Sequence, residues 1–586
     1  MSEQMPAAPL LLAAIMLPLL PRALRPVFFV AAPLLAFVLL TQLDAGAILT
    51  WPFLAYELVV SRVDRLSLAF GYVFTLAACL GGIYSFHLRD LGQQMASLFY
   101  AGAALAVVFA GDWLTLYVFW EVMAIASGWL ILSARTRASE LAGLRYLFFH
   151  LFGGAVLLAG ILWHLRQSGS LLFESLPANG AAWLILIGFA VNAALPPLHA
   201  WIADSYPEAT VTGSVFLSAF TTKAAVYVLA RAFPGWEFLV IAGTAMTLYG
   251  VVFAILENDI RRILSYHIVS QVGYMIVGIG LGTEAALNGS TAHAFAHILY
   301  KGLLFMAAGA VVHATGKRKL TELGGAIGAL PWLWILYMFG ALSISGLPLL
   351  SGFVSKSLVI HAAEIEHREW IVLFLGVASV GTFLSVGLKL PYFTWFGTTR
   401  SLQIEPIPLG MYFAMALASG INLAIGLRPQ LLYQVMPYEV DYDPYALAHL
   451  MEVGELLLFT ALAFWFFRAQ MAAKATISLD VDWLYRRTAP WFRRFTVTAL
   501  NDLFGLVDHF ALRCARRLSE LTANPRTFLA NLASASSTSG KAKAGMAELD
   551  YDPDRYRGPV GFALLIALAT FILLLGWNLF SEILHR

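Results

Sequence analysis

Stretches of about 20 apolar residues recur along nearly the whole chain, each long enough to cross the hydrocarbon core of a bilayer. Of all residues 60% are hydrophobic and 12% are charged, and that charged fraction is about half that of a typical soluble protein. We therefore predict an all-α, polytopic membrane protein with about 16 spans. We place them at approximately 8–21, 24–43, 66–87, 92–110, 113–133, 144–164, 181–201, 209–232, 237–257, 262–282, 287–313, 331–364, 370–396, 407–427, 446–468 and 559–580.

The first apolar run, 8–21, lacks a preceding basic region and a convincing small-residue cleavage site, so we expect a membrane helix and not a signal peptide. Cys79 and Cys514 are the two cysteines, which excludes iron–sulfur clusters and a disulfide framework. No Gly-rich phosphate loop occurs in the strand and helix context that it needs. We therefore expect no cofactor and no independent catalytic activity beyond ion translocation.

Lysines and arginines in the loops predict the orientation of the chain. Basic residues follow the first, fifth and eleventh predicted spans, and the segment 469–558 is also rich in arginine. The loop residues concerned are Arg22, Arg25, Arg135, Arg137, Lys317, Arg318 and Lys319. All these loops lie on one side if the spans alternate, so we expect that side to be cytoplasmic and both termini to lie outside.

Two predicted spans are interrupted in a similar way. The seventh ends in "AVNAALPPLHAW", with Pro196 and Pro197, and the twelfth contains "SISGLPLLSGFVSK", with Gly346 and Pro348. Such residues break a helix, and a break at membrane depth survives where it is buried in protein or lines a wet cavity. The breaks fall five spans apart, which predicts two inverted five-helix repeats over 92–232 and 237–396. Ordinary proline kinks are the alternative.

The flanking regions complete the predicted organisation. N-terminal membrane helices occupy 1–91, and additional membrane helices occupy 397–468. The segment 469–558 mixes arginines with aromatic residues at helical spacing, so we expect an amphipathic element on the cytoplasmic face, followed by the flexible linker "ASASSTSGKAKAG". A final membrane helix is expected in 559–586.

Five charged side chains lie inside predicted spans or at the breaks. They are Glu121, Lys223, Lys301, Lys356 and Lys389. A charge at the bilayer centre costs about 2.5–3.5 kcal/mol on insertion scales, so these groups should face the interior of the bundle, pair or be hydrated. Buried ion pairs or lysines that snorkel from helix ends explain one or two such residues, but five together favour an ion pathway.

The stretch "HAFAHILYKGLLF" carries His293, His297 and Lys301 at steps of four residues. On a helix these side chains share one face and span about 12 Å along the axis. A metal site is disfavoured, because the stretch lacks the glutamate of HExxH and no third ligand is evident. Polar filler is an alternative, but histidine titrates near neutral pH, so the ladder favours a proton relay. His267 in "RRILSYHIVSQVGY" is a candidate fourth member.

Four stretches carry a resemblance to a known family. They are "PPLHAWIADSYPEATVTGSVFLSAFTTKAAVY", "ENDIRRILSYHIVSQVGY", "HAFAHILYKGLLFMAAG" and "GLPLLSGFVSK". They resemble the antiporter-like, proton-translocating subunits shared by respiratory complex I, membrane-bound hydrogenases and Mrp-type Na+/H+ antiporters, over about residues 60–430. "VDYDPYALAHL" and "LDVDWLYRR" look closest to the D-type branch of the Mrp antiporter subunits.

The resemblance implies roles for individual residues. Glu121 matches the family's membrane glutamate, Lys223 the lysine after the first broken helix, Lys301 the central lysine, and Lys356 the lysine of the second broken helix. One position departs from the family. Asn192 stands where members usually carry a lysine, so we expect Lys223 to be the cationic partner of Glu121.

The resemblance further implies a proton-translocating subunit of a multisubunit complex in the bacterial inner membrane. The expected partners are other membrane subunits, protons and lipid, with Na+ as a candidate coupled ion and no nucleic acid. Three alternatives remain at this stage: a proton channel of a redox-driven pump, an ion-coupled subunit that energises uptake of a solute such as inorganic carbon, and a membrane-embedded transferase. The transferase predicts large catalytic loops, and the sequence has few long segments between spans.

Overall fold

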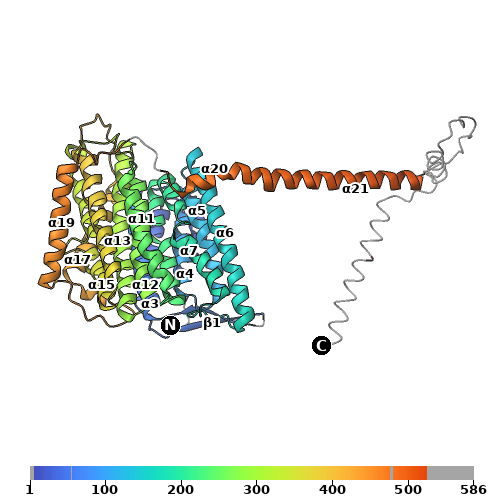
Figure 1. The fold of residues 1–586 in the computed structure, drawn as a ribbon, viewed down its shortest axis with the longest axis horizontal. Helices are drawn as coiled ribbons and strands as arrows, with labels where there is room; N and C mark the ends of the chain where they lie inside the picture. The colour runs from blue at the N-terminus through green and yellow to red at the C-terminus, as the bar shows by residue number, and fades with distance from the viewer. Residues whose placement is uncertain (1–4, 55, 475–478, 524–569, 571–586) are drawn as a thin grey trace, which may run out of the picture. The chain divides into compact units, whose positions relative to one another are not determined.

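The computed structural model describes residues 5–54, 56–474, 479–523 and 570. The chain divides into two units, 1–482 and 483–586. In the first unit the long helices run nearly parallel to one another (Figure 1). Eleven helices in the described residues are long and apolar enough to cross a membrane, and four shorter apolar helices accompany them. The prediction of a helical, multi-pass membrane protein is confirmed, whereas the number of 16 spans is not reproduced.

The helices of the first unit are α1 (Ala8–Met16), α2 (Arg25–Leu40), α3 (Arg65–Tyr84), α4 (Leu91–Phe109), α5 (Trp113–Leu132), α6 (Arg137–Ser168), α7 (Gly180–Ala193), α8 (Ala200–Ser205), α9 (Val211–Ala219), α10 (Thr221–Ala232), α11 (Glu237–Leu256), α12 (Ile260–Leu281), α13 (Glu284–Thr315), α14 (Pro331–Ser345), α15 (Ser351–Ile365), α16 (Glu369–Thr382), α17 (Leu409–Leu427), α18 (Gln430–Tyr433) and α19 (Leu447–Phe467). Short 3₁₀ turns lie at Leu17–Leu19, Tyr206–Glu208 and Ala326–Gly328, and π-helical stretches at Phe383–Lys389 and Tyr392–Phe396.

The expectation of an all-α chain misses one element. Strands β1 (Ile48–Phe53) and β2 (Tyr56–Arg62) pair antiparallel in a small hairpin between α2 and α3. Both strands contain aromatic and β-branched residues, which favour extended structure. The two strands are short and partly exposed, and the apolar runs of the neighbouring helices dominate this part of the sequence, so its pattern did not indicate a hairpin.

Side-chain caps explain why many helices begin where they do. Asp64, Asp90, Asp112 and Asp259 each accept hydrogen bonds from backbone N–H groups in the first turn of α3, α4, α5 and α12, respectively. Such caps satisfy donors that have no partner inside the helix. They fix the start of each span in a chain whose apolar runs alone leave the boundaries open.

The helices α12 and α13 form the centre of the first unit. Their most apolar windows are 100% and 94% buried, whereas that of α19 is 17% buried. α19 lies at one edge of the bundle (Figure 1). The polar residues of α12 and α13 are therefore enclosed by other helices, and the histidine ladder lies on one of the most buried spans of the described chain.

The second unit contains most of α20 (Val481–Arg493), a π-helical stretch at Arg494–Thr498 and α21 (Ala499–Ala523). Apolar side chains of α21 such as Leu503, Phe504 and Phe510 are exposed. The predicted amphipathic segment, 469–558, is helical over 481–523 and is not helical at 469–474 and 479–480. Its residues 475–478 and 524–558, which include the predicted linker, lie outside the described residues, as does the predicted final helix apart from Thr570.

Candidate functional site

The first helix break lies between α7 and α8. Ala194, the residue after α7, has a left-handed backbone with φ of 58°. The N–H groups of Ala194 and Leu195 donate to carbonyls of the last turn of α7 at 3.1 and 3.0 Å. This bonding is the Schellman arrangement that ends many helices. Pro196 and Pro197 follow directly and lie in the gap before α8.

The second break, between α14 and α15, has the same backbone bonding. Gly346 has φ of 79°, and the N–H groups of Gly346 and Leu347 donate to carbonyls of the last turn of α14 at 3.0 Å each. Pro348 follows one residue later. The two breaks are thus ended by the same hydrogen bonds, with a left-handed residue at the same place.

The side chains that bind the two ends differ. The ammonium of Lys356 donates to the carbonyl of Ile344 in the last turn of α14 at 2.8 Å. At the first break the indole N–H of Trp201 donates to the carbonyl of Val191 at 2.8 Å. Lys356, a titratable donor, thus binds a carbonyl that the second break leaves free, whereas Trp201, a neutral donor, adds a second hydrogen bond to a carbonyl that the Ala194 N–H already binds.

A third discontinuity positions Lys223. The helices α9 and α10 meet at Phe220, and the Lys223 Nζ donates to the carbonyl of Ser218 at 2.7 Å. Lys223 is fully buried in a span whose most apolar window is also fully buried. Like Lys356, it stabilises the carbonyl end of the helical segment that precedes it.

The histidine ladder lies on one continuous helix, α13. His293, His297 and Lys301 are all 0% exposed. Both ring nitrogens of His297 and the Nζ of Lys301 have no hydrogen-bond partner among the described residues. The structure thus places all three titratable side chains in the interior, and two of them, His297 and Lys301, lie there without a hydrogen-bond partner in the described chain. Within the described chain, no three His, Cys, Asp or Glu side chains are arranged to hold a metal ion.

Hydrogen bonds connect the ladder to neighbouring helices. His293 contacts Gln271 of α12 through Nε2 at 3.2 Å and Ser355 of α15 through Nδ1 at 3.1 Å. His267 of α12 contacts the hydroxyl of Ser385 at 2.7 Å. The three helices α12, α13 and α15 and the π-helical stretch after α16 therefore share one buried polar network.

Electrostatic interactions extend this network to both broken regions. Lys223 interacts with Lys301, His297 and His293. At the other end, Lys356 interacts with His293 and with His267. The structure therefore brings together six of the predicted residues, which form a continuous row of amines and imidazoles. We call this row, Lys223, His297, Lys301, His293, His267 and Lys356, the polar axis.

Glu121 does not pair with Lys223. Among the described residues Glu121 has no ion-pair partner within 4.0 Å, and its buried Oε1 has no hydrogen-bond partner. It lies against Gly154 of α6, where an added Cβ would approach Oε1 to 1.8 Å. Asn192, which replaces the family lysine, is fully buried, and neither polar atom of its amide is hydrogen-bonded within the described chain. The expected cationic partner of Glu121 is absent from this geometry.

Lys389 also lies apart from the polar axis. Its Nζ donates to the carbonyls of Ile255 and Glu257 at 2.5 and 3.0 Å, at the C-terminal end of α11. A lysine at a helix C-terminus stabilises free carbonyls and the negative end of the helix dipole. Lys389 thus binds a helix end, which was the structural alternative to a place in the ion pathway.

Sequence reasoning missed Asp480, which lies just before α20. Its carboxylate accepts hydrogen bonds from the hydroxyls of Tyr249 and Tyr266, the latter at 2.6 Å, and lies 3.2 Å from Nε2 of His199. Burial alone would raise the pKa of Asp480, but the contacts with His199 and the two tyrosines hold it below its ordinary value. No local pattern indicates this contact, because its partners are more than 200 residues away in the sequence.

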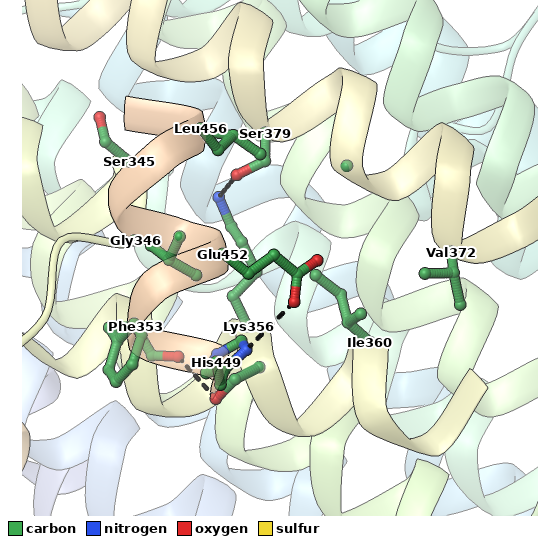
Figure 2. Close-up of a pocket in the computed structure, with 13 residues that line it drawn as sticks. Ser345, Gly346, Phe353, Lys356, Ile360, Val372, Ser379, His449, Glu452 and Leu456 are labelled. Atoms are coloured by element: carbon green, nitrogen blue, oxygen red, sulfur yellow. Dashed lines mark hydrogen bonds and ion pairs between the residues drawn. The ribbon is translucent and has the colours of Figure 1, made fainter. Parts of the chain in front are cut away.

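A second set of missed residues lies beside Lys356. A cavity of about 70 Å³ lies between α15, α16 and α19, and its lining includes Lys356, Ser379, His449 and Glu452. Figure 2 shows the Lys356 ammonium near Ser379 and the Glu452 carboxylate joined to His449. The available signal was the pair His449 and Glu452, three residues apart at the start of an otherwise apolar span.

Comparisons with known proteins place this geometry in a wider group. A family described as "NADH:quinone oxidoreductase/Mrp antiporter, TM" matches residues 110–385. An uncharacterised protein of Methanocaldococcus jannaschii is 30% identical over 58% of this chain and 74% of its own length. The D-type subunit of the Na(+)/H(+) antiporter of Alkalihalophilus pseudofirmus is 32% identical over 50% of this chain and 63% of its own length.

The fold agrees with a solved structure. A chain of the Mrp complex of Dietzia sp. superimposes with a TM-score of 0.65 at 22% identity, and the match covers 77% of this chain and 98% of that one. The family match contains all six polar-axis residues, five on α10, α12 and α13 and Lys356 on α15, and it also contains both helix breaks. From these matches we conclude that the chain belongs to the NADH:quinone oxidoreductase/Mrp antiporter transmembrane family.

Proposed function

We propose that this protein is a proton-translocating, antiporter-like member of a multisubunit membrane complex, equivalent to the D-type subunit of Mrp Na+/H+ antiporters. The observation that carries the proposal is the polar axis, a row of buried amines and imidazoles between Lys223 and Lys356. Charged and titratable groups inside a membrane are costly and mark ion paths or relays. The similarity to the D-type subunit of a Na(+)/H(+) antiporter supports the same reading.

The proposed path runs along the axis in both directions. A proton moves between Lys223 and the pair His297 and Lys301, then through His293 to Lys356. The hydroxyl of Ser355 and the amide of Gln271 hold the His293 ring in place through its two nitrogens. Glu121 lies at the margin of this path, and its carboxylate supplies a separate site that accepts a proton.

Coupling along the axis is electrostatic. Two unit charges about 6 Å apart at an effective dielectric near 20 interact by about 2.8 kcal/mol. That is equivalent to about two pKa units, enough to change the protonation state of a neighbouring group. A proton that arrives at one lysine therefore displaces a proton from the next, and the chain needs no redox centre of its own for this step.

The architecture proposed for this path is a pair of inverted repeats, 92–232 and 237–396. The identical backbone bonding at the two breaks supports this assignment. Domains 1–91 and 397–468 flank the repeats, and 469–558 and 559–586 follow them. We propose a bacterial inner-membrane location, with the basic loops in the cytoplasm and both termini outside.

The proposed partners are other membrane subunits, and the coupled ion is Na+. A redox-driven pump is the second candidate, because the matching family also includes NADH:quinone oxidoreductase subunits. Uptake of a solute such as inorganic carbon is a third use of the same path. The chains that co-purify with this protein distinguish the redox-driven pump from the other two candidates, since only the redox pump requires iron–sulfur subunits.

The test is reconstitution of the whole purified complex into vesicles that contain a pH-sensitive dye. An imposed Na+ gradient should drive proton movement that depends on the complex and disappears when the gradient is collapsed. Proton movement without any Na+ dependence would favour the redox or solute-uptake alternatives. Absence of proton movement under a Na+ gradient, a membrane potential and the redox partners would overturn the proposal.

A further inference from the structure

The cavity beside Lys356 links a buried amine to the outer face of α19. Lys356 is 3% exposed, and it forms part of the cavity wall with Ser357 and Ser379. The Lys356 Nζ lies 3.3 Å from the hydroxyl of Ser379. The opposite wall is formed by α19, the least buried of the candidate spans.

Two titratable residues of α19 line this opposite wall. The side chain of Glu452 is 71% exposed, and its carboxylate lies 3.9 Å from Nδ1 of His449. The His449 ring stacks on Phe353 of α15 with centroids 5.3 Å apart, so it lies between the two helices. Its Nε2 is buried and has no hydrogen-bond partner among the described residues. Figure 2 shows His449 and Glu452 on the side of the cavity that faces Lys356.

The position of Glu452 along its helix allows contact with water. It lies five residues after the start of α19, or about 8 Å along the axis at 1.5 Å per residue. A carboxylate at this depth reaches the membrane interface, whereas one at the centre would be costly. Both residues of the pair thus lie within the first two turns of α19 and also line the cavity.

A second acid and imidazole pair lies at the same end of the bundle. His361 and Glu364 of α15 approach each other to 3.6 Å, and both interact electrostatically with His449. The partly exposed carboxylates give this opening a negative character, which raises the local concentration of protons and other cations. Lys223 and Lys301, farther along the polar axis, are fully buried.

We propose that Glu452 and His449 form the outer end of a proton path that reaches Lys356 through this cavity. This inference rests on the proposed function and adds the residues through which the second broken helix exchanges protons with the interface. Glu452 takes a proton from water or releases one to it. His449 passes the proton across the space between α19 and α15, and Lys356 is the inner acceptor.

The first test measures access to the cavity and does not depend on transport. In the intact complex, with Cys79→Ser and Cys514→Ser as background, the Ser357→Cys variant should react with a cationic methanethiosulfonate at least about tenfold faster than the Ser355→Cys variant. Ser357 lines the cavity, whereas Ser355 lies on the same helix, is fully buried and faces His293. Adding Glu452→Gln should reduce the preference for a cationic over an anionic reagent, and adding Glu455→Gln should not.

The second test measures proton flux in vesicles that contain the same complex. Glu452→Gln and His449→Ala should each slow proton flux several-fold, while Glu455→Gln, an exposed acid of the same helix that does not line the cavity, should leave it unchanged. Equal labelling of the two cysteine variants, or rapid labelling with normal flux in both α19 variants, would overturn the path alone. A wild-type complex that moves no protons would overturn the proposed function as well as this path.

Discussion

The two helix breaks of this protein share a backbone and differ in the side chains around it. At both, a left-handed residue and the same two N–H bonds end the first helical segment, and a proline follows. At the first break the indole of Trp201 adds a second hydrogen bond to the Val191 carbonyl, and at the second the ammonium of Lys356 binds the free carbonyl of Ile344. The same local structure is therefore stabilised by a neutral group in one place and by a titratable group in the other.

This difference separates the structural role of a break from its role in transport. A break needs a donor for its free carbonyl, and either side chain can supply one. Only the lysine also adds a proton site, and only the second break opens on the cavity with Glu452. Within residues 92–232 the buried lysine is Lys223, which lies at the junction of α9 and α10.

The comparison is most strongly tested by removing each donor. Lys356→Met should reduce proton flux by on the order of 100-fold, because it removes a proton site from the axis. Trp201→Phe should leave flux within about twofold but lower the free energy of unfolding by about 0.5–1.5 kcal/mol, because the Val191 carbonyl loses one of two hydrogen bonds and keeps the one from the Ala194 N–H. Flux in vesicles and denaturant titration of the same complexes measure both effects. Equal loss of flux in the two variants would mean that the breaks do not differ in function.

A smaller effect on flux is expected near Glu121. Gly154→Ala places a Cβ where the Glu121 carboxylate now lies, so the side chain must move and flux should fall several-fold. Gly420→Ala is a matched control, because a Cβ there meets no atom within 4 Å. Normal flux in the Gly154→Ala complex, together with normal expression, would argue that the position of Glu121 is unimportant for transport.

The contacts of Asp480 with His199, Tyr249 and Tyr266 should affect stability more than flux. Asp480→Asn weakens the contacts with Tyr249, Tyr266 and His199 and should lower the free energy of unfolding by about 1–3 kcal/mol. Because the folded-state pKa of Asp480 is lowered, the stabilisation is present above the ordinary carboxyl pKa of about 3.9 and is lost as the pH falls below it. Thermal melts at pH 7 and at pH 4 and below check this. An unchanged melt at pH 7 would show that the contact contributes nothing.

The smallest expected effect lies in the backbone of the breaks. Ala194 occupies a left-handed conformation that Gly346 adopts without strain. Ala194→Gly should therefore raise the free energy of unfolding by about 0.5–1 kcal/mol, since relief of strain is partly offset by greater freedom of the unfolded chain. Gly346→Ala should lower it by a similar amount. Denaturant titration that shows the opposite signs would contradict the shared geometry of the two breaks.

The residue pattern predicted those features that depend on neighbours along the chain. The α13 ladder needed only a spacing of four residues on one helix, and the family motifs pointed to Lys223, Lys301 and Lys356. A strong apolar periodicity also sufficed to predict membrane helices, but it obscured the short hairpin β1–β2.

The features that could not be predicted depend on contacts between distant segments. The pairing of Glu121 with Lys223 was expected because Asn192 replaces the lysine usual in the family, yet the Lys223 ammonium binds a nearby carbonyl instead. Lys389 was included in the proton path because it lies in an apolar span, and its contacts at the end of α11 appear only in three dimensions. Asp480 and Glu452 likewise gain their neighbours through packing, which no local pattern describes.

The most direct test of the central claim is the proton flux of the Lys301→Ala complex. Lys301 lies at the middle of the polar axis, is fully buried and interacts with Lys223. We predict that the variant complex assembles with all its subunits and loses proton flux, while Lys317→Ala, at an exposed lysine beyond the same helix, retains it. Normal proton flux through a fully assembled Lys301→Ala complex would contradict the account.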